Sequence, residues 1–163
     1  PSIPNSKVAI QPLEYTGEDT EHKIIRIKNE LRKMHCDGML VSALDDIAWI
    51  LNLRGTDVHC NPVFVSYLLI QESNVTLFIN KEKLTSEVEK YLESQKISIQ
   101  EYDNVATYLK RKYFAWPERY SSSLAGIFAL SFWDWQENRN TVSSSSNVFM
   151  QVLFCFCFDS RLR

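Results

Sequence analysis

The sequence predicts an α/β fold in which a mixed β-sheet is flanked by helices, followed by an irregular C-terminal extension. Between residues 16 and 112, segments with helical apolar spacing alternate with short apolar or β-branched runs. Two of these runs, 63–70 and 75–80, are joined only by the polar residues QESN, which favours an antiparallel hairpin. Residues 113–163 keep neither period and are rich in aromatic residues and serine clusters. We therefore predict a domain over 16–112 and an atypical tail over 113–163.

The first part of the domain is expected to form a helix, a strand and a second helix. Apolar spacing predicts a helix over 16–35, with Thr16 as its cap. An Asp-Gly pair breaks this helix, and the apolar run 39–42 then indicates a short buried strand. Ser42 is the expected cap of a helix over 45–53.

The second part continues with the hairpin, a helix, a strand and a last helix. Asn80 is the expected cap of a helix over 81–94. A strand over 97–102 follows, and Asp103 is the expected cap of a final helix within 104–112. This element order is typical of a mixed sheet.

Composition excludes several classes of protein. The 163 residues include 18 basic and 20 acidic side chains, a formal charge of -2 that provides no field for nucleic acid or an anionic membrane. The N-terminal segment PSIPNSKVAIQPLEY lacks the basic and apolar regions of a signal peptide. The cysteines follow neither a disulfide framework nor a paired CxxC pattern, which favours a reduced, cytoplasmic environment; they are Cys36, Cys60, Cys155 and Cys157. The last two alternate within FCFCF, and two thiols on one strand face cannot complete a zinc site.

Asp45 and Asp46 are the first candidates for catalysis, because paired carboxylates can share acid and base roles. Their place at a helix start favours a structural role instead, since acidic side chains there stabilise the positive helix end. His22 and His35 lie on or just after the first predicted helix, where a solvated histidine is the simpler interpretation.

The loop after the second predicted helix is the most unusual segment. Gly55 is expected to end that helix in the left-handed conformation. Arg54 then suits either a bidentate carboxylate contact or a structural salt bridge. His59 lies beside Asp57 and Cys60, but a surface histidine is favoured over a metal ligand, and a buried thiol over a nucleophile.

The stretch ALDDIAWILNLRGTDVHCNPVFVSYLLI, residues 43–70, closely resembles the cytosolic aminopeptidase P family, the Xaa-Pro aminopeptidases of three-domain type. In that family the second domain opens with the form LDEIAWLLNLRGSDV, followed by NPVFFSY. The positions that match are Leu44, Asp45, Ile47, Ala48, Trp49, Leu51, Asn52, Leu53, Arg54, Gly55, Asp57, Asn61, Pro62, Phe64, Ser66 and Tyr67. The resemblance covers residues 1–112.

The resemblance implies a creatinase-N-terminal-like domain with ribonuclease H-like topology, preceded by an interdomain linker over 1–15. In such enzymes a separate pita-bread catalytic domain holds two divalent ions, usually manganese, and removes an N-terminal residue that precedes proline. Its ligand motifs do not occur after residue 112. We therefore expect no catalytic residue, metal ligand or bound cofactor in this chain, and no activity from it alone.

Within the intact enzyme, the resemblance implies that the domain lies beside the catalytic cleft and meets proline-containing peptides. The candidate residues for a substrate-access loop are Arg54, Asp57, His59 and Asn61. The implied parent is cytoplasmic, and a homodimeric parent is left open.

Two interpretations stay open for the tail and two for the function. Residues 113–163 are interpreted as non-native family sequence, from an alternative exon, retained intron or shifted frame, with a hydrophobic docking segment as the competing idea. The alternative function is a non-enzymatic creatinase-like protein-interaction module. A nuclease is disfavoured, because the chain offers no basic groove for nucleic acid.

Overall fold

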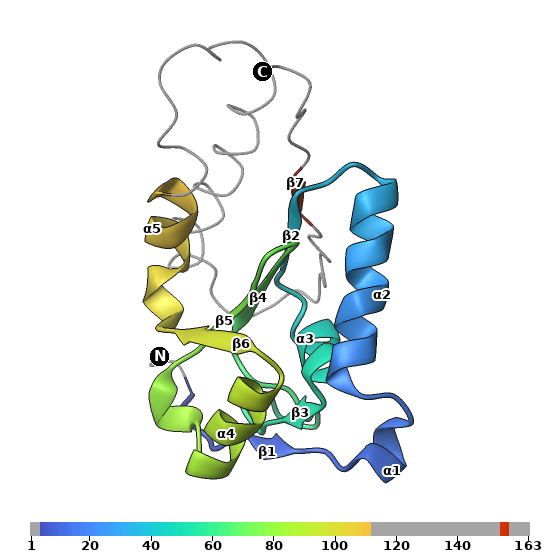
Figure 1. The fold of residues 1–163 in the computed structure, drawn as a ribbon. Helices are drawn as coiled ribbons and strands as arrows, with labels where there is room; N and C mark the ends of the chain where they lie inside the picture. Colours follow the sequence, from blue (N-terminus) through green and yellow to red (C-terminus); the bar gives the residue numbers. More distant parts are fainter. Residues whose placement is uncertain (1–3, 112–153, 157–163) are drawn as a thin grey trace. The chain divides into compact units, whose positions relative to one another are not determined.

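The computed structural model describes residues 4–111 and 154–156 (Figure 1). The chain divides into two compact units, residues 1–106 with 151–163 and residues 107–150, and the sheets belong to the first. The main sheet has five strands in the order β6-β5-β4-β2-β7. They are β2 (Gly38–Val41), β4 (Tyr67–Gln71), β5 (Val75–Phe78), β6 (Ile97–Gln100) and β7 (Phe154–Phe156). Only the β5–β6 pair is parallel, which confirms the mixed sheet.

Helices and short helical turns connect these strands. The α-helices are α1 (Leu13–Thr16), α2 (Thr20–Lys33), α3 (Leu44–Leu51), α4 (Ser86–Ser94) and α5 (Val105–Leu109), and the 3₁₀ turns are η1 (Lys81–Lys83) and η2 (Tyr102–Asn104). Strand β1 (Ala9–Ile10) pairs antiparallel with β3 (Leu53–Arg54) in a separate two-stranded sheet. No helix among the described residues is both long enough and apolar enough to cross a membrane.

One hydrophobic core joins the sheet to α2, α3 and α4. Alternate strand residues enter it, as expected for a pleated strand. The strand contributions include Met39, Val41, Leu68, Ile70, Val75, Leu77 and Ile97, and the helical ones include Ile24, Leu31, Ile47, Ile50, Leu51, Val88 and Leu92. The predicted hairpin is confirmed as β4 and β5, with Ile70 paired to Val75. The core therefore fixes both ends of the segment between α3 and β4.

Three predicted caps are wrong, those of α2, α3 and α5. Asp19, not Thr16, caps α2 by accepting a hydrogen bond from the His22 amide at 2.8 Å. Thr16 instead ends the short helix α1. At α3 the capping position is Ala43, without a side-chain hydrogen bond, so Ser42 does not cap that helix. Before α2 both Thr16 and Asp19 can cap, so local spacing alone did not select the right one; before α3 the helix begins one residue too late for Ser42 to occupy the capping position.

Gly55 has a different role from the one predicted. Asn52 ends α3 in the left-handed conformation, with φ 52°, whereas Gly55 has no positive φ. A Cβ at Gly55 would lie 2.7 Å from the Cβ of Phe64 and 2.9 Å from the carbonyl oxygen of Val63. Glycine is needed there because two backbone segments approach each other closely.

The later helices are shorter than predicted. Residues 81–94 divide into η1, capped by Asn80, and α4, capped by Thr85. Asp103 lies inside η2 and does not cap α5, which begins at Val105. Strands β1 and β3 were not predicted, because two residues each carry no periodic signal. In the tail, β7 includes Cys155, and Cys157 lies outside the described residues.

Candidate functional site

The segment between β3 and β4 folds back on itself as a narrow loop. The Gly55 amide donates to the Pro62 carbonyl at 3.4 Å, and the Asp57 amide to the Val63 carbonyl at 3.2 Å. At the tip, the Asn61 amide donates to the Val58 carbonyl at 3.2 Å. We call residues 58–61 the tip turn. The three bonds and the close approach at Gly55 fix the backbone of the whole loop.

Asp57 lies at the base of the loop with a fully enclosed carboxylate. One oxygen, Oδ1, accepts a hydrogen bond from the Ser6 hydroxyl. The other, Oδ2, accepts from the Val65 amide at 2.6 Å and forms an ion pair with Lys83, whose side chain is also 0 % exposed. We call Ser6, Asp57, Val65 and Lys83 the Asp57 network. Every oxygen of the carboxylate is engaged within the protein.

The Asp57 network changes the acidity of its central group. Burial by itself raises the pKa of Asp57, but hydrogen bonds from Lys83, Ser6 and the Val65 amide outweigh it. The pKa of Asp57 therefore lies below its ordinary value, and the carboxylate stays ionised at neutral pH. A carboxylate held in this way stabilises the loop and does not face a substrate.

Arg54 bonds backbone carbonyls of the domain, and neither predicted contact, a bidentate carboxylate contact or a salt bridge, is found for it among the described residues. Its Nη1 atom donates to the carbonyl oxygens of Ala48 and Leu53, at 2.8 Å each. The Ala48 carbonyl, in the last turn of α3, also accepts the backbone amide of Asn52, so Arg54 adds a second donor to it. The structure therefore places Arg54 at the helix end, as a half-buried side chain.

The tip turn exposes the remaining candidates. His59 and Cys60 are exposed, Asn61 is half-buried, and Val58 is 40 % exposed. The prediction of a buried Cys60 thiol is therefore wrong, because the tip turn holds this residue away from the core. Cys60 has φ 61°, in the left-handed region that residues other than glycine, asparagine and aspartate rarely adopt. The four predicted loop residues thus separate into two internal anchors, Arg54 and Asp57, and two tip-turn residues, the exposed His59 and the half-buried Asn61.

Sequence reasoning missed Ser6 and Lys83. Both lie far from Asp57 in the chain, and each resembles an ordinary polar residue in its own segment. A fully buried aspartate needs a compensating donor or cation, but this requirement does not say which one supplies it. Only the folded chain identifies Ser6 and Lys83.

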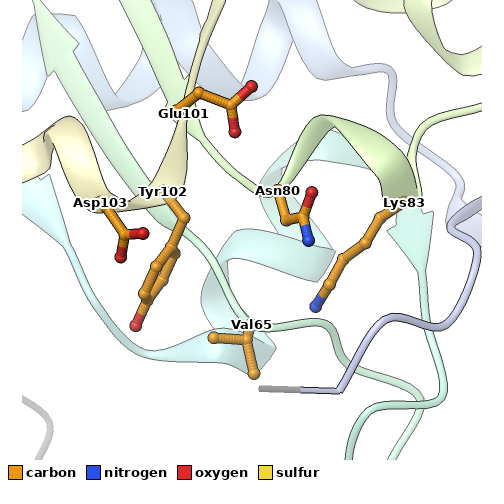
Figure 2. Close-up of a pocket in the computed structure, with 6 residues that line it drawn as sticks. All are labelled: Val65, Asn80, Lys83, Glu101, Tyr102 and Asp103. Carbon is orange, nitrogen blue, oxygen red and sulfur yellow. The ribbon is translucent and has the colours of Figure 1, made fainter. Parts of the chain in front are cut away.

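A shallow pocket of about 200 Å³ lies next to the Asp57 network (Figure 2). Val65 and Lys83 belong to both features, and the other lining residues are Asn80, Glu101, Tyr102 and Asp103. Tyr102 is stacked on Tyr67 with ring centroids 5.2 Å apart. Glu101 forms an ion pair with Lys81, which does not line the pocket, at 3.6 Å. These contacts show a wall built from packed and paired side chains.

The other sequence candidates lie away from the loop. Asp45 and Asp46 lie in the first turn of α3, as expected. Burial, and next the charge of Asp45, raise the pKa of Asp46. His22 bonds its capping partner Asp19, and this hydrogen bond raises the pKa of His22. Among residues 4–111 and 154–156, no three His, Cys, Asp or Glu side chains lie close enough together to hold a metal ion.

The antiparallel hairpin, the parallel edge strand and the helices over one core define a mixed-sheet α/β domain, on which the loop is carried as a rigid insertion. The chain belongs to the Creatinase/Prolidase N-terminal domain family, which it matches over residues 1–148. That match confirms the creatinase-type fold predicted from the sequence. It continues beyond residue 112, and the domain boundary there stays a prediction.

Relatives of known name support the more specific resemblance to aminopeptidase P. The chain is 44% identical over 105 residues to a probable Xaa-Pro aminopeptidase P of Ajellomyces capsulatus (strain H143), covering 64% of this chain and 16% of the relative. It is 40% identical over 105 residues to the corresponding protein of Pyricularia oryzae, covering 64% and 17%. The chain therefore spans about a sixth of the length of these relatives.

A solved structure has the same fold. The X-prolyl aminopeptidase of Caenorhabditis elegans, a cytosolic enzyme with a di-nuclear active site, superposes with a TM-score of 0.68 and 30% identity. The match covers 71% of this chain and 19% of that enzyme. The sequence-based identification with the aminopeptidase P family is thereby confirmed.

Proposed function

We propose that this chain is the non-catalytic second domain of a metal-dependent Xaa-Pro aminopeptidase, which removes an N-terminal residue preceding proline. The observation that carries the proposal is the 44% identity to a probable Xaa-Pro aminopeptidase P, together with the match to the creatinase/prolidase N-terminal family. The domain supplies no reacting group. It acts by shaping the approach to a catalytic domain elsewhere in the parent.

The Asp57 network supports a structural role for the loop. Arg54 and Asp57 direct their polar atoms at carbonyl, hydroxyl, amide and ammonium groups of the domain itself. The tip turn carries the two candidates that are not enclosed in this way, the exposed His59 and the half-buried Asn61. We assign the tip turn, not the loop base, to limiting which peptides reach the catalytic cleft.

The divalent ions of the parent belong, in this proposal, to its catalytic domain. The C. elegans enzyme has a di-nuclear active site, and the described residues of this chain offer no cluster of ligands that fits such a pair. When bound, manganese would supply Lewis acidity and an activated water for attack on the Xaa-Pro bond. The cytosolic nature of that enzyme supports a cytoplasmic location for the parent.

Two measurements test this function. The purified 163-residue chain, incubated with Arg-Pro-Pro and manganese, should release no arginine. Replacing the matching region of the C. elegans enzyme by residues 1–111 of this chain should preserve Xaa-Pro hydrolysis, because the two share a fold at 30% identity. Hydrolysis by the chain alone would contradict the non-catalytic role. A folded, metal-loaded but inactive hybrid would favour an interaction module instead.

The access role has its own measurement in the same hybrid enzyme. His59→Ala and Asn61→Ala should change KM for long peptides more than KM for a dipeptide, and leave kcat for the dipeptide within about twofold. Lys90→Ala, an exposed change on α4, is the matched control. Equal effects on short and long peptides would remove the tip turn from peptide selection.

A further inference from the structure

The segment that enters the domain is bonded to it along its whole length. The Asn5 side chain donates to Glu82 at 2.6 Å, and the Lys7 ammonium donates to the Glu82 carbonyl. The Val8 amide donates to the Lys83 carbonyl at 3.0 Å. Residues 9–10 then form β1, and the Gln11 amide donates to the Asn52 carbonyl at 2.8 Å. We call residues 5–11 the entry segment.

Ser6 is where the entry segment meets the loop. Its hydroxyl donates to Oδ1 of Asp57, whereas Oδ2 of the same carboxylate takes the Val65 amide and the Lys83 ammonium. The Asp57 amide, on the same residue, donates to the Val63 carbonyl and closes the loop. Asp57 thus bonds the entry segment, η1 and the opposite side of its own loop.

We propose that Asp57 is a positioning residue that couples the path of the entry segment to the orientation of the tip turn. The coupling is local, because the Asp57 carboxylate bonds Ser6 while the Asp57 amide bonds the Val63 carbonyl within the loop. A displacement of residues 5–8 therefore shifts the Asp57 carboxylate and, with it, the backbone that carries His59 and Asn61. The meaning of this coupling for peptide access rests on the proposed function; the coupling itself does not.

Ser6 is the best place to interrupt the coupling. Ser6→Ala removes one hydrogen bond from the carboxylate and leaves the Asp57–Lys83 ion pair in place, so the buried ammonium keeps its partner. Ser6→Thr keeps the hydroxyl and serves as the conservative rescue. Ser94→Ala is the matched control, since the Ser94 hydroxyl donates only to the nearby Tyr91 carbonyl, at 2.7 Å.

Amide hydrogen exchange of the full 163-residue chain tests the coupling. In Ser6→Ala the amides of Asp57, Asn61 and Val63 should exchange about fivefold faster, the factor that corresponds to one net hydrogen bond. The β4 amides at Leu68–Ile70 should be unchanged, because they report the core. Ser6→Thr should restore slow exchange, and Ser94→Ala should leave all of these amides as in the wild type.

Two results would overturn the proposal. Faster exchange at Lys7 and Val8 alone, with an unchanged loop, would show that the two segments move separately. A uniform acceleration that includes β4 would mean that Ser6 contributes only to overall stability. Neither result depends on peptidase activity, so an inactive hybrid enzyme with a coupled loop would reject the proposed function and leave this inference standing.

Discussion

The two fully buried lysines among residues 4–111 have their ammonium groups stabilised in different ways. Lys83 is 0 % exposed and pairs with the Asp57 carboxylate. Lys23 is 1 % exposed and donates to the Trp49 carbonyl at 2.7 Å and to Oδ1 of Asn52 at 2.6 Å. Its ammonium also lies 4.3 Å from the centroid of the Trp49 ring. One ammonium is held by an opposite charge, and the other by neutral dipoles and a ring face.

This difference matches what each lysine joins. Lys23 connects α2 to the end of α3, where the Trp49 carbonyl accepts the Asn52 amide at 3.4 Å and the Lys23 ammonium as a second donor. Burial lowers the pKa of Lys23, and the charge of Glu18 offsets that effect only in part. Lys83 connects η1 to a loop that has no helix end to supply acceptors, so a carboxylate is needed. The acceptor of each buried ammonium thus depends on its neighbours: a carboxylate for Lys83, and a carbonyl and an amide oxygen for Lys23.

Removing the carboxylate partner should have the largest effect. Asp57→Ala leaves the Lys83 ammonium buried without its ion pair and is expected to cost about 3–5 kcal/mol of unfolding free energy. Urea denaturation of the full chain measures this. The double variant Asp57→Leu with Lys83→Met should recover most of the loss, because the pair is replaced by apolar groups. A double variant as unstable as Asp57→Ala would mean that the ion pair itself is indispensable.

Lowering the pH should cause the second largest loss of unfolding free energy, by protonating Asp57. The pKa of Asp57 is lowered in the folded state, so its stabilisation is complete above the ordinary value of 3.8 and is lost as pH falls through the folded pKa. Unfolding free energy measured from pH 6 to pH 2 should fall less steeply in the double variant than in the wild type. Asp19 and Glu72 also have lowered pKa values and provide a shared background. Identical slopes would contradict the assignment to Asp57.

Replacing Lys23 should lower the unfolding free energy less than replacing Asp57. Lys23→Met removes the ammonium and leaves two acceptors, the Trp49 carbonyl and Asn52 Oδ1, without this donor, at an expected cost of about 1–3 kcal/mol. The measurement is again the denaturation midpoint, with Lys90→Met on the exposed face of α4 as control. A loss as large as that of Asp57→Ala would erase the distinction between the two lysines.

The cation–π contacts of Trp49 should contribute the least to the unfolding free energy. Trp49 is 43 % exposed and has the Arg26 guanidinium 5.6 Å from its centroid in addition to Lys23. Trp49→Leu is expected to cost about 0.5–1 kcal/mol, the range for a partly exposed cation–π contact. Trp49→Phe should lose less, because it keeps an aromatic face. Equal losses in both variants would assign the effect to packing.

The order of elements could be predicted because its signals are local. The hairpin followed from two β-branched runs separated by four polar residues, and α2 and α4 from apolar spacing at a helical period. The caps were less well determined, since Thr16 and Asp19 both precede α2 and only the backbone geometry selects between them. The loop was identified as unusual from its composition. Composition did not show which of its residues are anchored in the domain and which lie in the tip turn.

The sequence by itself determined the mixed α/β fold, the family and the location of the loop, because periodicity and a long matching motif are properties of neighbouring residues. Only the tertiary structure decided that Arg54 and Asp57 are anchors while His59 is exposed and Asn61 is half-buried in the tip turn. Asp57 meets Lys83 and Ser6 across 26 and 51 positions of the chain. Partners at that separation are chosen by the packing that buries the carboxylate, and no local pattern encodes it.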